Sequence, residues 1–117
     1  MTILEMTEKQ PTNDVFINTE LSEKSFLELV PDFILEIEED LTSLLDYFHD
    51  KNLMEVRLTA HKIKGTASSY GAMLLSDSAL EVQVAPDDLA EMSVLIKKMT
   101  AATETTITFA KENFLQK

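Results

Sequence analysis

The sequence lacks several features on which common classes of protein depend. It has no cysteine, which excludes a disulfide scaffold, a thiolate zinc site and a cysteine nucleophile. Its two histidines are too few for a histidine-rich metal cluster. Only two glycines and three prolines are present, whereas an all-β domain needs a turn about every 8–12 residues. These absences favour an all-α fold.

Positive charge is also scarce, since 10 Lys and Arg stand against 21 Asp and Glu and the net charge is −11. Such a chain is repelled by nucleic acid and by anionic lipid, so neither is an expected partner. No run reaches the roughly 18 apolar residues of a membrane span, and residues 1–10 lack the basic start of a signal peptide. We therefore expect a free-standing cytoplasmic protein with one domain.

Apolar residues recur at steps of three and four from Ser22 onward, which predicts amphipathic helices. The predicted helices cover approximately residues 22–48, 53–69, 72–84 and 87–114. Gly71 suits a turn, and Pro86 with the acids after it suits a helix start. Pro31 falls inside the first helix, but the apolar stripe keeps its phase there, which predicts a kink or a nearly collinear restart.

Four such helices with short connections predict an antiparallel four-helix bundle over residues 19–117. Residues 1–18 are expected to form an N-terminal tail or a short extra helix. The stripes place Leu45 and Leu89 on the inner face of the bundle. The acidic run of Glu36, Glu38, Glu39 and Asp40 is interpreted as a solvated helix face and not as a catalytic carboxylate pair.

His61 lies off the buried stripe of the second predicted helix, whose centre is about 120–140° away on a helical wheel. The residues within about 60° of His61 are Met54, Arg57, Lys64, Gly65 and Ser68. Between Lys51 and Lys64 there are four cations and one acid, a local charge of +3. An exposed imidazole beside cations and a small residue suits a phosphoryl carrier, because the neutral ring is the nucleophile and the cations neutralise phosphoryl oxygens.

Each of these features also has a purely structural explanation. A surface histidine is commonly just solvated, an interior glycine often serves close helix packing, and a basic cluster is often a solvated face. From residue types and spacing alone, both interpretations of His61 therefore stay open. His49 serves as a contrast, because it lies near Asp46 and Asp50 at a helix end without basic neighbours, where it suits the helix dipole.

The twelve residues from His61 to Ala72, HKIKGTASSYGA, resemble the signature of histidine-containing phosphotransfer (HPt) domains. That signature runs His, any residue, apolar, Lys, Gly, two small residues and, after a few positions, Gly-Ala. The resemblance extends from about Phe26 to Leu80. Tyr70 departs from the usual aliphatic residue and Thr66 from the usual serine or alanine, and neither change affects the chemistry.

The resemblance implies a phosphoryl carrier that is not an autonomous enzyme. It takes a phosphoryl group from the aspartate of one receiver domain and passes it to another. His61 is then the phosphorylated residue, Lys64 the cation beside the phosphoryl group, and Gly65 the clearance for the receiver's loops. A glutamine on the following helix often lies near the histidine in this family, and Gln83 is the candidate for it and for the docking surface. From its residue type alone, Gln83 can equally be a solvated surface amide.

We further expect Arg57 to assist Lys64 in stabilising the transferring group. A transient docking surface is expected from Met54, Leu58, Gly65 and Ser68. No metal and no cofactor are expected in this chain, since the receiver brings its own magnesium, and the protein is expected to be a monomer. The alternative function is a helical adapter that binds signalling partners without being phosphorylated.

Overall fold

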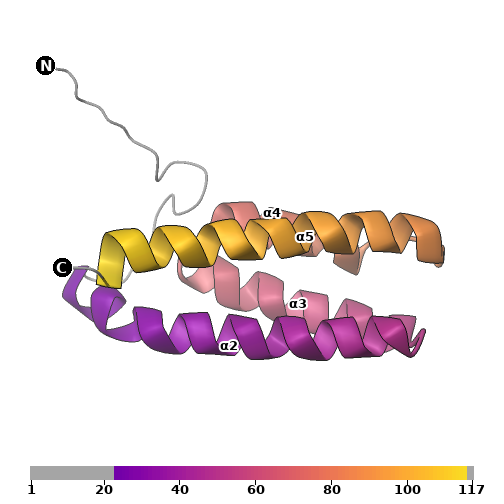
Figure 1. Cartoon of the computed structure of the whole chain (residues 1–117), viewed down its shortest axis with the longest axis horizontal. Helices are drawn as coiled ribbons and strands as arrows, with labels where there is room; N and C mark the ends of the chain where they lie inside the picture. Colours follow the sequence, from indigo (N-terminus) through magenta and orange to yellow (C-terminus); the bar gives the residue numbers. More distant parts are fainter. Residues whose placement is uncertain (1–22, 116–117) are drawn as a thin grey trace, which may run out of the picture.

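A computed structural model of the chain describes the backbone of residues 23–115 and the side chains of residues 28–113. Four long helices follow one another, namely α2 (Glu23–His49), α3 (Leu53–Ser69), α4 (Met73–Gln83) and α5 (Leu89–Ala110). A short π-helical turn, Lys111–Leu115, extends α5. Figure 1 shows the helices lying lengthwise side by side, each reversing the direction of the one before it.

The expected all-α four-helix bundle is confirmed, and the described residues contain no strand. The tail or extra helix expected at residues 1–18, and the start of the bundle at residue 19, lie outside the described residues. α3 packs between α2 and α4, and α4 packs on α5. Within residues 23–115, none of the helices combines the length and apolar character needed to cross a membrane.

The helix ends follow from local chemistry. Asn52 caps α3 because its side-chain oxygen accepts a hydrogen bond from the Glu55 backbone N–H at 3.3 Å. After α3 the chain turns at Gly71, whose φ of 75° is a conformation that glycine adopts without steric cost. Asp88 caps α5 in the same way as Asn52, so that helix starts two residues later than the expected position 87.

Pro31 lies inside α2, which runs continuously from Glu23 to His49. Val30 and Phe33 on either side of the proline are both fully buried, so the buried face includes residues before and after Pro31. A restart at Pro31 is therefore excluded, because the helix is not interrupted there. Pro31 itself is exposed, which keeps its ring away from the packed side of the helix.

The core consists of the predicted inner faces with two exceptions. Its largest fully buried side chains are Phe33, Ile37, Leu44, Ile63, Leu75, Met92 and Met99. The expectation that Leu45 and Leu89 are buried is wrong, since both are exposed. Leu44 takes the inward position next to Leu45, and Leu89 is the first residue of α5, one turn before the core begins at Met92.

The expectation of a fully solvated acidic face on α2 is wrong for one residue. Glu36, Glu38 and Glu39 are exposed, but Asp40 is only 7% exposed. Its carboxylate accepts a hydrogen bond from the Lys62 ammonium on α3 at 3.1 Å. Asp40 therefore faces the neighbouring helix, where a buried carboxylate is stabilised by a cation.

Candidate functional site

The position of His61 follows from the way α3 packs. The side of α3 that faces the core carries Val56, Ala60, Ile63 and Ala67, all fully buried. His61 lies away from these residues and is exposed. The imidazole therefore stands on the outer side of a helix whose orientation is set by four buried neighbours.

Gly65 lies one turn beyond His61 and is also exposed. A Cβ atom added to Gly65 would meet no neighbouring element within 4 Å in the described part of the chain, so packing among the described residues does not require a glycine there. Close helix packing, the structural explanation for this residue, is therefore excluded. The missing side chain instead leaves open space one helical turn from the imidazole.

The two lysines near His61 have different surroundings. The Lys62 ammonium pairs with the Asp40 carboxylate, and this hydrogen bond raises the pKa of Lys62. Lys64 is half-buried, and its ammonium forms no ion pair within the described part of the chain. Lys64 thus keeps an uncompensated charge one turn from His61, whereas the charge of Lys62 is offset by an acid.

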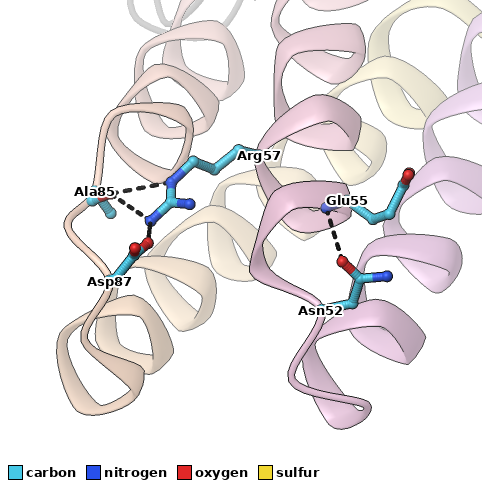
Figure 2. A network of polar contacts seen from close by, with 5 residues as sticks. All are labelled: Asn52, Glu55, Arg57, Ala85 and Asp87. Atoms are coloured by element: carbon cyan, nitrogen blue, oxygen red, sulfur yellow. Dashed lines mark hydrogen bonds and ion pairs between the residues drawn. The ribbon is translucent and has the colours of Figure 1, made fainter.

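Arg57 points to the loop between α4 and α5, as Figure 2 shows. Its Nε and Nη2 atoms donate hydrogen bonds to the Ala85 carbonyl oxygen at 3.1 and 3.0 Å. Nη2 also donates to the carboxylate of Asp87. A direct part in phosphoryl transfer would therefore require the guanidinium to leave these two partners.

The side of α4 next to the His61 face is polar and small. The Ser76 hydroxyl lies 3.5 Å from both the Ser68 hydroxyl and the Lys64 carbonyl oxygen.

Gln83 is half-buried, and its Oε1 atom is buried without a hydrogen-bond partner among the described residues. Such an unpaired oxygen is unusual in a folded protein, which sets Gln83 apart from a solvated surface amide.

Exposed apolar side chains surround this region on two helices. On α3, Met54 and Leu58 are exposed, as expected for docking residues, and α4 adds Leu80 and Val84. Because α3 and α4 are antiparallel and Arg57 meets Ala85, Leu80 lies near the level of His61. The sequence interpretation missed both Leu80 and Val84 as docking residues, although their spacing of four, off the Ala79 and Val82 stripe, was a usable signal.

The described residues contain no group of three or more His, Asp or Glu side chains placed to hold a metal ion. A family model for the Hpt domain matches residues 26–106, which is more than half of the chain. The match includes all of α3 and α4 and therefore every candidate residue from Met54 to Val84. No curated protein and no solved structure matches the chain.

Proposed function

The chain belongs to the Hpt domain family, and we propose that it carries a phosphoryl group on His61 between receiver domains of a multistep phosphorelay. Hpt domains are phosphocarrier modules of phosphorelays and interact with receiver domains. One observation carries the assignment to this residue: His61 is exposed beside Gly65, where an added Cβ would meet none of the packed neighbours within 4 Å among the described residues.

The proposed reaction exchanges one bond to phosphorus for another. A neutral ring nitrogen of His61 forms the N–P bond while the P–O bond to the receiver's aspartate breaks, and the carboxylate leaves with the bonding electrons. The proton on the other ring nitrogen passes to water. The reverse reaction on a second receiver's aspartate releases His61 in its original form.

Lys64 is the proposed partner of the transferring group. It lies three residues after His61, and side chains at this spacing are neighbours on a helix. Its ammonium has no acidic partner in residues 28–113, so its charge is available to phosphoryl oxygens. Lys62 is less suited to this role because it is held by Asp40 on α2.

The receiver is proposed to dock over the outer faces of α3 and α4. Gly65 and Ser68 leave room beside the imidazole, and apolar contact comes from Met54, Leu58, Leu80 and Val84. Gln83, half-buried on α4, is proposed to lie at the border of this surface. In this proposal the protein acts in the cytoplasm as a monomer, because the same face must be free for each receiver in turn.

The test is phosphoryl transfer from a panel of receiver domains charged with acetyl phosphate. The wild-type protein should gain a label that is stable in alkali and lost in acid, as expected of a phosphoramidate bond. His61→Gln should remove the label, and His49→Gln should retain it as the matched control on α2. Phosphoramidate, a small donor that needs no docking, is used beside the receivers.

Two results would contradict the proposal. Label retained by His61→Gln would move the chemistry to another residue. If neither the receivers nor phosphoramidate label the wild-type protein, His61 is not a reactive histidine, and the helical adapter becomes the better description.

A further inference from the structure

The loop from Val84 to Asp88 connects α4 to α5 with few internal bonds. Its backbone bonds are short-range: Ala85 N–H donates to Val82 at 3.3 Å, and Asp88 N–H to Pro86 at 2.8 Å. Pro86, Asp87 and Asp88 are exposed, whereas Ala85 is buried. A buried carbonyl oxygen needs a hydrogen-bond partner. For Ala85, which lies two residues beyond the end of α4 at Gln83, that partner is Arg57.

The bond pattern at this loop uses the particular shape of arginine. Nε and Nη2 converge on one oxygen, that of Ala85, while Nη2 also reaches Asp87. A lysine has one terminal nitrogen and cannot reproduce the fork of donors. The Arg57 side chain is 26% exposed and that of Asp87 is 80% exposed, so the ion pair itself is weakly stabilising. The hydrogen bonds to Ala85 therefore contribute most of the stabilisation that Arg57 gives to the loop.

The residues on either side of these bonds belong to the proposed docking surface. Val84 directly precedes Ala85, and Leu80 lies one turn before Val84 on the same exposed side of α4. Met54 and Leu58 flank Arg57 on α3. Arg57 therefore joins the two helices at the point where their exposed apolar side chains meet.

We infer that Arg57 is a positioning residue, which holds the end of α4 against α3 so that Leu80 and Val84 face the receiver, and that it supplies no charge to the phosphoryl group. The inference rests on the proposed function of His61 and refines the expected role of Arg57. Moving the guanidinium to His61 would break all of its bonds and leave the Ala85 carbonyl oxygen without its partner, which is costly for a buried residue. Within residues 28–113, the Lys64 side chain forms no ion pair that would have to break.

The experiment compares Arg57→Ala with Lys64→Met using two phosphoryl donors. Phosphoramidate labels His61 without docking, so Arg57→Ala should keep the wild-type labelling rate while Lys64→Met lowers it. With a receiver as donor, Arg57→Ala should raise KM about 10-fold with little change in kcat, the size of effect expected from loss of one well-placed interface contact. Arg57→Lys should not restore the wild-type KM, because it lacks the forked donors.

A second measurement does not depend on phosphoryl transfer. Deuterium exchange at the amides of residues 85, 87 and 88 should be faster in Arg57→Ala than in the wild type and unchanged in Lys64→Met. Asp87→Asn keeps the bonds to Ala85 and should show a smaller increase, which provides a milder test if Arg57→Ala fails to fold. If the wild type is not labelled at all, the proposed function fails. Deuterium exchange still tests whether Arg57 stabilises the loop between α4 and α5.

The inference is overturned by either of two results. One is a fall in phosphoramidate labelling by Arg57→Ala that matches the fall in Lys64→Met, since Arg57 would then act at the phosphoryl group. The other is unchanged exchange in the loop of Arg57→Ala, since the guanidinium would then hold nothing.

Discussion

The two flanks of α3 beside His61 carry the same kind of side chain in different surroundings. On the flank facing α2, Lys62 pairs with Asp40, and Thr66 donates a hydrogen bond to Glu36 at 3.2 Å. On the flank facing α4, Lys64 has no acidic partner among the described residues. Two lysines separated by one residue thus differ in whether an acidic side chain of the neighbouring helix compensates their charge.

The neighbouring helices account for this difference. α2 presents carboxylates to α3, while the residue of α4 that contacts the Lys64 backbone is Ser76, which is uncharged. Glu81 on α4 is directed to the other side, where Lys98 on α5 binds its carboxylate at 2.9 Å. Among the described residues, Lys64 is thus left without an acidic partner, while Asp40 on α2 pairs with Lys62 and Glu81 on α4 pairs with Lys98.

The largest expected effect separates the two lysines. Lys64→Met should lower the rate of transfer from a receiver to His61 about 100-fold, the effect of removing one group that stabilises transferring charge. The melting temperature should stay near that of the wild type, because Lys64 forms no ion pair with any of the described residues. Rapid-quench measurement of labelled protein, with a thermal melt beside it, checks both statements.

Lys62→Met is the matched control for this comparison. It should transfer at nearly the wild-type rate but melt at a lower temperature. The reason is that the buried Asp40 carboxylate loses the one hydrogen-bond partner it has among the described residues. Equal losses of transfer in the two variants would mean that the two flanks do not differ in function.

The second prediction compares the two glycines. Gly65→Ala should stabilise the protein by about 1 kcal/mol, since alanine is the better helix former and the added methyl group meets open space. Transfer from a receiver should nevertheless fall about 10-fold, because the methyl group occupies space needed by the docked partner. Denaturant unfolding tests the predicted gain in stability, and the kinetics of transfer from a receiver test the predicted loss of rate.

Gly71→Ala is the control, because its φ of 75° makes alanine strained there and the variant should be less stable than the wild type. A Gly65→Ala protein that is less stable, or that transfers normally, would contradict the assignment of Gly65 to partner clearance.

The smallest expected effect concerns pH. The hydrogen bond from Lys62 to Asp40 raises the pKa of Lys62 above its ordinary value of 10.5. A raised pKa in the folded state means that the stabilisation is complete below pH 10.5 and is lost as pH rises through the folded value. The effect should be small, because the Lys62 side chain is 60% exposed and solvent screens the pair.

Thermal melts of the wild type and Lys62→Met at neutral and alkaline pH test this prediction. The difference in melting temperature between them should narrow at alkaline pH. Burial also raises the pKa of Tyr70, but that contribution is common to both proteins and leaves their difference unchanged. A constant difference across the pH range would show that the charge of Lys62 does not stabilise Asp40.

The sequence predicted the helices closely because their signals are local. The period of apolar residues located α2, α3 and α4 to within one or two residues of their described ends, and the caps at Asn52 and Asp88 follow from side chains next to the helices they start. The same period assigned Leu45 and Leu89 to the core incorrectly. Periodicity predicts the direction in which the apolar face of a helix points, but not how wide the buried part of that face is. It also does not predict at which residue the neighbouring helices begin to cover that face.

The sequence by itself determined that His61 stands off the buried stripe of a helix with Lys64 and Gly65 one turn away, because these positions depend only on helical geometry. The tertiary structure alone decided that Lys62 meets Asp40 and that Arg57 binds Ala85 and Asp87. It also decided that none of the described residues packs within 4 Å of a Cβ added at Gly65. Contacts between residues 22 to 30 positions apart depend on how neighbouring helices are aligned along their lengths. Local spacing carries no information about that alignment.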